Sequence, residues 1–206
     1  MSHFQNDLRK RAEDLVVLYP VKRSAMLPLL HLVQEQDGYL SEEGITEVAE
    51  LVGTSEAEVR GTAAFYDMFH LEPVGKYVVG ICTNIACLLA GGEELLEHAT
   101  KKLGCAVGGT SSDGLFTLEE TECLADCDIA PVVQVNHRYV RTTTPDAFDA
   151  MIEEVRDGKR ESEIPPHGTL IRVRRSSGLQ APREEIATQR ASAQAAREAR
   201  AAKEQN

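Results

Sequence analysis

Two short cysteine motifs, CTNIAC at residues 82–87 and CLADC at residues 123–127, determine how this sequence is interpreted. They contain four of its five cysteines. Within each motif the spacer is short enough for both sulfur atoms to face the same point, and the fold can bring the two motifs together. The spacing therefore predicts a site in which the thiolates of Cys82, Cys87, Cys123 and Cys127 bind one metal ion or one iron–sulfur cluster.

The spacing alone leaves two kinds of thiolate site open. C-x4-C combined with C-x3-C lies close to the common spacings of structural zinc sites, and an iron–sulfur cluster needs the same four thiolates. A thioredoxin-type redox dithiol is disfavoured, because that chemistry uses C-x-x-C and neither motif has it. The fifth cysteine, Cys105, follows Gly104 and is expected to be a small buried apolar residue.

The composition limits the class of protein. The chain has 206 residues and is 42% hydrophobic, which is enough for one medium domain or two small ones with an apolar core. No apolar segment reaches the length of a membrane span, and Met1–Lys10 is too polar for a signal peptide. We therefore expect a cytoplasmic protein without direct membrane insertion, whose thiols stay reduced. The formal net charge of −11 argues against nucleic acid as a partner.

The residues before the cysteine motifs predict a bundle of helices. Apolar residues follow helical spacing over residues 8–16. They do so again over Met26–Val33, where Pro28 falls in the first turn and Gly38 marks the end.

Two further helices are predicted, each with its own N-cap. Ser41 is expected to cap a helix that ends at Gly53. Ser55 and Glu58 are expected to form a capping box for the next helix, which runs toward Tyr66.

Residues 47–59 also have the rhythm of a DNA-binding helix-turn-helix. A recognition helix presents its N-terminal residues to the bases and needs basic groups for the phosphates. Here that end carries Glu56 and Glu58, with Arg60 alone to oppose them. Carboxylates directed at a polyanion would repel it, so we interpret these helices as a packing module.

After Pro73 the apolar pattern changes to strand type. Short apolar runs at Tyr77–Ile81 and Leu115–Leu118 predict two strands. Between them, Gly91-Gly92 opens a helix that Gly104 closes. The first cysteine motif thus falls where a strand leads into helical structure.

The region after the second cysteine motif predicts a hairpin and a helix. Residues 132–140 form two strands that turn at Asn136-His137. Thr144 caps the last clear helix, with Pro145 at its first position. The resulting order of strand, helix, three strands and helix fits a small α/β sandwich of thioredoxin type.

The sequence therefore predicts an α+β protein in three parts. Residues 1–73 form an N-terminal helical bundle, residues 74–160 form a small α/β domain of thioredoxin type, and residues 161–206 are an extension. From Ser176 onward the extension is rich in Ala, Arg and Glu and nearly lacks large aliphatic residues. Such a tail cannot bury a core, so we expect it to be disordered or a marginal helix.

Two groups of motifs together are more specific than either cysteine pair alone. They are CTNIAC at 82–87, Gly91-Gly92, Cys123-Leu124-x-x-Cys127 with Ala130-Pro131, and, upstream, GTAAFYDMF at 61–69 and Pro73–Lys76. These motifs resemble the thioredoxin-like [2Fe-2S] subunit, known as the E subunit, of bacterial NADH:quinone oxidoreductase, which is respiratory complex I. The resemblance covers roughly residues 10–160.

The resemblance implies that the helical bundle is followed by a thioredoxin-like α/β ferredoxin domain. This domain would hold one [2Fe-2S] cluster whose ligands are Cys82, Cys87, Cys123 and Cys127. It favours iron–sulfur over zinc. It also implies that FMN and NADH are bound by a partner subunit, so that this chain transfers electrons without a complete active site of its own. The expected partners are that flavin- and NADH-binding subunit and the larger iron–sulfur subunit of the same complex.

The resemblance further implies a place for the chain in the cell. It would belong to the peripheral arm of a redox-driven, proton-translocating complex on the cytoplasmic face of the inner membrane. The alternatives are the equivalent diaphorase subunit of a soluble NAD-linked hydrogenase or formate dehydrogenase, and a non-catalytic zinc-binding interaction module. No catalytic residue is predicted, because Gly91-Gly92 is too short for a dinucleotide-binding loop and no carboxylate pair suggests acid–base catalysis.

The second motif departs from the family pattern, which often reads C-L-G-A-C. Ala125 and Asp126 stand between the cysteines here. Loss of the glycine disfavours a turn with a positive φ at this point. An ionised Asp126 would lower the reduction potential of a neighbouring cluster, because it adds negative charge.

Overall fold

The computed structural model describes residues 3–5, 7–168, 188, 191–192 and 194–195 of the chain. Contacts divide it into two units, one ending at Glu72 and one beginning at Pro73. Each unit is built around its own apolar core. The tail predicted from Ser176 onward lies almost wholly outside the described residues.

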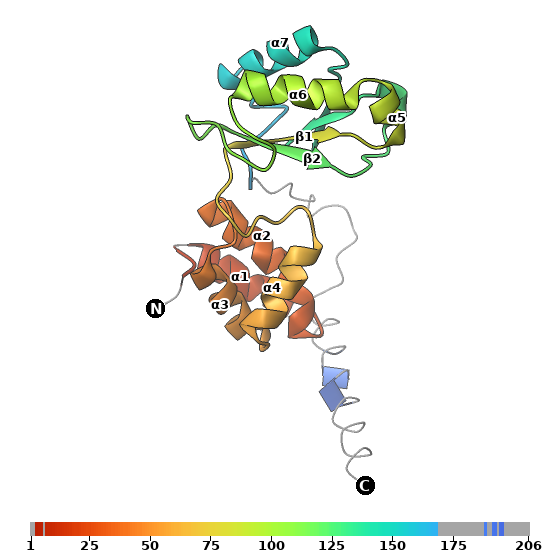
Figure 1. The fold of residues 1–206 in the computed structure, drawn as a ribbon. Coiled ribbons are helices and arrows are strands. Elements are labelled where there is room, and N and C mark those ends of the chain that lie inside the picture. The colour runs from red at the N-terminus through yellow and green to blue at the C-terminus, as the bar shows by residue number, and fades with distance from the viewer. Residues whose placement is uncertain (1–2, 6, 169–187, 189–190, 193, 196–206) are drawn as a thin grey trace. The chain divides into compact units, whose positions relative to one another are not determined.

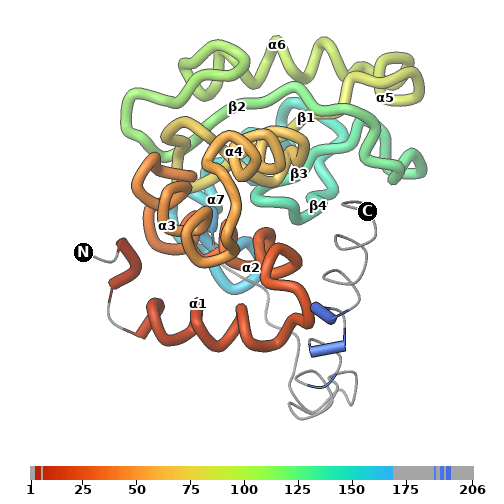
Figure 2. Tube along the Cα trace, turned by 90° about the horizontal axis from the view of Figure 1, so that it is seen from below, coloured from red at the N-terminus to blue at the C-terminus, as the bar shows by residue number. Residues whose placement is uncertain are grey.

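The first unit is the predicted helical bundle. The elements are α1 (Asp7–Val17), the 3-10 helix η1 (Lys22–Ala25), α2 (Met26–Asp37), α3 (Glu42–Val52) and α4 (Glu56–Phe65). The core includes fully buried aliphatic side chains, among them Leu29, Leu30 and Val48. Helices α2 and α3 pack against each other, as do α3 and α4, and α1 contacts α2 (Figure 2).

The predicted helix starts are present in the bundle, although one cap differs in detail. Ser41 accepts a hydrogen bond from the Gly44 N–H, and Ser55 accepts one from the Glu58 N–H. The Glu58 carboxylate contacts the Thr54 hydroxyl and Arg23 rather than returning to Ser55. The capping box expected at Ser55 is therefore half formed, because Glu58 has partners that sequence spacing does not indicate.

The second unit holds a four-stranded sheet and its helices. The elements are β1 (Tyr77–Cys82), α5 (Ile85–Leu89), α6 (Gly92–Leu103), β2 (Phe116–Thr121), the 3-10 helix η2 (Cys127–Ile129), β3 (Val133–Val135), β4 (Arg138–Val140) and α7 (Pro145–Arg156). The strand order in the sheet is β2-β1-β3-β4. The central strand β1 pairs in parallel with β2 and antiparallel with β3, and β3 pairs antiparallel with β4. Helices α6 and α7 contact each other on one face of this sheet (Figure 1).

This architecture confirms the predicted α+β fold with a thioredoxin-like second unit. The hairpin turns at Asn136 and His137, whose φ angles of 48° and 61° are those that a tight two-residue hairpin turn requires. Thr144 caps α7 by accepting from the Ala147 N–H. One strand differs from the prediction: β2 begins at Phe116 and runs on to Thr121, beyond the expected end at Leu118.

The core of the second unit forms between the sheet and its helices. All six residues of β1 are buried, as a central strand with covered faces requires. Ile164 is fully buried in the same core, so the second unit continues beyond residue 160. The expectation that Cys105 is buried was wrong: it is half-buried, and desolvation raises the pKa of its thiol.

Candidate metal centre

The first cysteine pair is held by regular secondary structure. Cys82 is the last residue of β1, and Cys87 lies within α5, which begins three residues later. Their exposed fractions are only 1% and 2%. The Cys82 N–H donates a 3.0 Å hydrogen bond to the Val132 carbonyl, which ties the end of β1 to the segment leading into β3.

Gly92 lies directly against the backbone of both cysteines of this pair. A Cβ atom at residue 92 would come within 2.8 Å of the Cys82 carbonyl oxygen and 2.9 Å of the Cys87 carbonyl oxygen. Gly91 precedes it with a φ of 93°, which residues with a Cβ rarely adopt. Two glycines thus let α6 start in contact with the two cysteine residues.

The second cysteine pair lies in irregular structure. Cys123 follows the end of β2, Cys127 begins η2, and both residues are exposed. Between them, Ala125 has a φ of 59°. The turn disfavoured by the loss of the family's glycine is therefore present, with alanine in the left-handed conformation.

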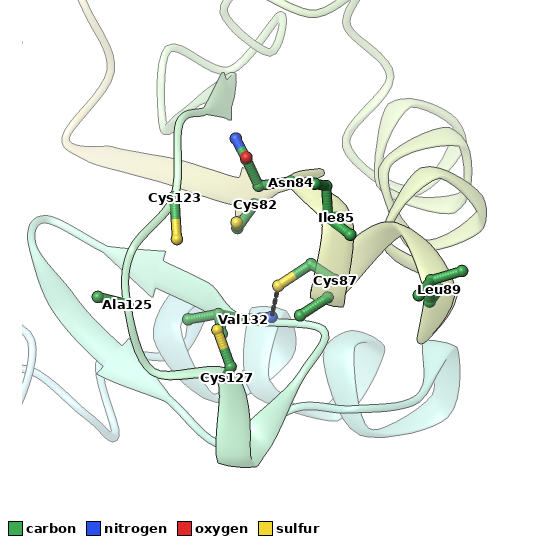
Figure 3. A pocket seen from close by; sticks show the side chains of 10 residues that line it. Cys82, Asn84, Ile85, Cys87, Leu89, Cys123, Ala125, Cys127 and Val132 are labelled. Carbon is green, nitrogen blue, oxygen red and sulfur yellow. Dashed lines mark hydrogen bonds between the residues drawn. The ribbon is translucent and has the colours of Figure 1, made fainter.

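The two pairs meet at one pocket of about 440 Å³. Figure 3 shows the sulfur atoms of all four predicted ligands around the same space. Apolar side chains supply most of the remaining wall. The lining residues are Cys82, Asn84, Ile85, Ala86, Cys87, Leu89, Cys123, Ala125, Cys127 and Val132.

The thiols of the pocket influence one another. Burial raises the pKa of Cys87, and the neighbouring thiols of Cys82 and Cys127 raise it further. Desolvation likewise raises the pKa of Cys127, with contributions from Cys123 and Cys82. These raised pKa values favour the protonated state of the Cys87 and Cys127 thiols, so metal binding here must release their protons.

One backbone group supports a thiolate at this site. The Val132 N–H donates to the Cys87 sulfur at 3.4 Å (Figure 3), and this hydrogen bond opposes the rise in the Cys87 pKa. Hydrogen bonds of this kind lower the electron density on a ligand sulfur. Neither this contact nor the role of Gly92 follows from the cysteine spacing.

Other metal-binding side chains do not join the pocket. Among the described residues, no group of three or more His, Cys, Asp or Glu side chains has an arrangement that could hold a metal ion. His98 on α6 contacts the Asp149 carboxylate on α7 at 2.7 Å, and the ring of His31 packs against Phe69. Cys105 is not among the lining residues.

A family model described as the thioredoxin-like [2Fe-2S] ferredoxin matches residues 12–156. The chain belongs to this family. The matched range extends over both units of the structure, from the helical bundle to the last helix of the second unit.

Relatives of the chain are subunits of NADH-quinone oxidoreductases. "NADH-quinone oxidoreductase subunit 2" of Thermus thermophilus is 41% identical over 78% of this chain and 91% of the relative. The E subunit of the NADH-quinone oxidoreductase of Mycobacterium tuberculosis is 41% identical over 70% of this chain and 58% of the relative. The chain thus spans under two thirds of the mycobacterial protein. In Rhizobium meliloti, the E subunit that carries the number 2 is 37% identical over 76% of this chain and 94% of the relative.

A solved structure shares the fold of this thioredoxin-like ferredoxin. It is described as an NAD+-reducing [NiFe]-hydrogenase in the air-oxidised state, with a TM-score of 0.58 and 23% identity. The similarity covers 68% of this chain and 24% of the hydrogenase chain.

Within the residues that the structure describes, no helix is long and apolar enough to span a membrane.

Proposed function

We propose that this chain is an electron-transfer subunit of an NADH:quinone oxidoreductase. It holds one [2Fe-2S] cluster through Cys82, Cys87, Cys123 and Cys127. The observation that carries the proposal is the convergence of these four thiols on one pocket at the end of the central strand. The subunit names of the relatives support the choice of complex.

The pocket residues fit this cofactor. A [2Fe-2S] cluster is held by four thiolates, and the pocket offers four sulfur donors within largely apolar walls. The Val132 N–H, which already donates to the Cys87 sulfur, supplies the kind of backbone hydrogen bond that tunes such a cluster. When bound, the cluster supplies one-electron redox chemistry, and this chain's residues hold it and limit its contact with water.

The number of electrons that NADH and the cluster transfer determines which cofactors the complex needs. NADH delivers two electrons as a hydride, whereas a [2Fe-2S] cluster accepts one, so a flavin must stand between them. The sequence contains no dinucleotide-binding loop after a strand. We therefore assign FMN and NADH to a partner subunit, with the larger iron–sulfur subunit as a further neighbour. The complex would place this chain in a peripheral arm at the cytoplasmic face of the membrane.

The surface beside the pocket suits such a partner. Helix α5 exposes Ile85 and Leu89, with exposed fractions of 76% and 84%, and both residues line the pocket. The carboxylates of Glu120 and Glu122 accept hydrogen bonds from Thr83 and Asn84 just before this helix. An apolar contact bordered by carboxylates favours a partner whose apolar surface is framed by basic side chains.

A second candidate function is supported by the hydrogenase similarity. Under it, the chain would serve as the equivalent electron-transfer module of a soluble NAD-linked hydrogenase or formate dehydrogenase. The cluster and its ligands would be the same. The enzyme with which the protein co-purifies separates the two functions.

The test is bleaching of the cluster's visible absorption after mixing with NADH. We expect no bleaching on the time scale of catalysis with the cluster-loaded chain alone, and rapid bleaching after addition of the flavin-bearing subunit. Leu89→Glu should slow reduction within the pair without changing the cluster spectrum. Val107→Glu, at an exposed valine outside the pocket, is the matched control. Rapid bleaching of the chain alone, free of flavin, would contradict the assignment of the nucleotide site to a partner.

A further inference from the structure

The segment between Cys123 and Cys127 lacks the support of regular secondary structure. It contains Ala125 with a φ of 59°, a conformation that is disfavoured for any residue with a Cβ. Leu124 is partly buried against the small apolar cluster formed by Cys82, Cys87, Ile129 and Val132. An unsupported chain would relax Ala125 toward a right-handed or extended conformation, which would turn the flanking peptides and with them the two cysteines.

A tyrosine from the far edge of the sheet contacts this segment. Tyr139 lies on β4, the strand at one edge of the sheet, and its hydroxyl donates a 2.7 Å hydrogen bond to the Leu124 carbonyl. Across the described residues, this is the one hydrogen bond that links Cys123, Leu124 or Ala125 to another part of the protein.

The exposure of Tyr139 indicates that this residue acts on the structure through its hydroxyl group and not through burial of its ring. The residue is 49% exposed, which is high for a large aromatic residue, so burial alone stabilises it little. A hydroxyl bonded to a main-chain carbonyl beside a left-handed residue restricts rotation of that peptide. The contact therefore acts on the Leu124–Ala125 peptide, next to Cys123.

We propose that Tyr139 is a positioning residue for the second cysteine pair. Its hydroxyl holds the Leu124 carbonyl and thereby keeps Ala125 left-handed, so that Cys123 and Cys127 both face the pocket. This inference rests on the proposed function in one respect, namely that these two cysteines are cluster ligands. Alanine in place of glycine at residue 125 makes the restraint necessary, because glycine adopts a positive φ without steric cost.

The test variant is Tyr139→Phe, which keeps the ring and removes the hydroxyl. In the metal-free protein, we expect lower backbone NMR order parameters over residues 122–128 and no change in the helical bundle. In the cluster-loaded protein, loss of iron to a chelator should accelerate by roughly threefold to tenfold, the effect of losing one hydrogen bond. The paramagnetic signal of the reduced cluster should broaden, because the ligand geometry becomes less uniform.

Adding Ala125→Gly to Tyr139→Phe should return the rate of iron loss most of the way to that of the unmodified protein. Tyr39→Phe, in the first unit, is the control for tyrosine substitution and should change none of these measurements. Unchanged order parameters and unchanged iron loss in Tyr139→Phe would refute the positioning role. A Tyr139→Phe defect that Ala125→Gly leaves in place would refute the link to Ala125.

The failure of this inference can be distinguished from the failure of the proposed function. If the unmodified protein binds no iron, the proposed function fails, whatever the Tyr139 variant does. The order parameters of the metal-free protein still test whether Tyr139 orders the segment.

Discussion

The two cysteine pairs are built in different ways although they line the same pocket. Cys82 and Cys87 are buried at the junction of a central strand and a helix, with Gly92 against their carbonyls and a backbone N–H on the Cys87 sulfur. Cys123 and Cys127 are exposed in irregular structure around a left-handed alanine. One half of the site is fixed by packing, and the other depends on a few local contacts.

This difference indicates separate tasks for the two halves. The buried pair belongs to the core, so its geometry is set when the sheet folds. The exposed pair lies on the solvent side of the pocket, where the proposed cofactor and partner protein would approach. Substitutions in the first half should therefore affect both folding and binding, and those in the second half mainly binding.

Cysteine substitution should have the largest effect. Cys82→Ser or Cys87→Ser should lower iron content by more than roughly tenfold, because the rigid backbone cannot bring the shorter serine side chain to the metal. Cys127→Ser should retain a labile cluster, because its segment can adjust. The iron content and the paramagnetic signal of the reduced cluster measure how much cluster each variant retains.

Cys105→Ser is the control. Because Cys105 lies outside the pocket, this substitution should leave the cluster and its spectrum intact. If Cys105→Ser lost the cluster while Cys87→Ser kept it, the ligand assignment would be wrong. Equal loss in Cys87→Ser and Cys127→Ser would remove the distinction between the two halves.

Gly92→Ala should have the next largest effect on iron content, and it should also destabilise the fold. The added methyl group meets the Cys82 and Cys87 carbonyl oxygens at 2.8 and 2.9 Å, so α6 or the first cysteine pair must shift. We expect a loss of about 1–3 kcal/mol in the free energy of unfolding, together with lower iron content. Denaturant unfolding and metal analysis measure the two.

The matched control for Gly92→Ala is Gly61→Ala on α4, where nothing lies within 4 Å of the added Cβ. That substitution should stabilise the protein by about 0.5–1 kcal/mol, since alanine favours the helix. Similar effects of the two substitutions would mean that Gly92 does not support the first pair.

Ala125→Gly alone should have a small effect on stability. Relief of the left-handed alanine is worth about 1–2 kcal/mol, and the larger entropy of glycine in the unfolded chain offsets about 0.4–1 kcal/mol of that. The net change in thermal unfolding should be a slight stabilisation. A clear destabilisation would show that the Cys123–Cys127 segment does not strain its alanine.

The smallest effect on the free energy of unfolding is expected from the ion pair between Asp113 and Arg156, which lies outside both cysteine segments. Hydrogen bonds from Ser111, the Leu115 N–H and Arg156 hold the pKa of Asp113 down to about 2. Because the folded-state pKa lies below the unfolded value, the resulting stability is present above about pH 4 and is lost as the pH falls toward 2. Asp113→Asn should flatten this part of the unfolding profile of the metal-free protein. An unchanged profile would exclude a contribution from Asp113.

Local sequence signals predicted the elements of the fold well. Ser41, Ser55 and Thr144 cap helices in the structure as expected, because a capping side chain acts on backbone within three residues of itself. The hairpin turn at Asn136-His137 has the same local origin. The cysteine spacing likewise singled out the four cysteines among the ten residues that line the pocket.

The contacts that the sequence did not predict join residues far apart in the chain. The Val132 N–H meets the Cys87 sulfur, and Tyr139 meets Leu124, only after the sheet has assembled. The burial of Ile164 depends in the same way on the completed core. No periodic pattern or short motif encodes such pairings, so the supporting contacts of the site required the structure.

The central claim is that the four cysteines of this thioredoxin-like ferredoxin together hold one binuclear cluster. It is tested most directly by iron, zinc and acid-labile sulfide analysis of the anaerobically purified protein, with the paramagnetic spectrum recorded after reduction. The account predicts two irons and two sulfides per chain and the signal of a reduced [2Fe-2S] centre, all lost in Cys87→Ser. One zinc per chain without sulfide, or iron and sulfide unchanged in Cys87→Ser, would contradict it.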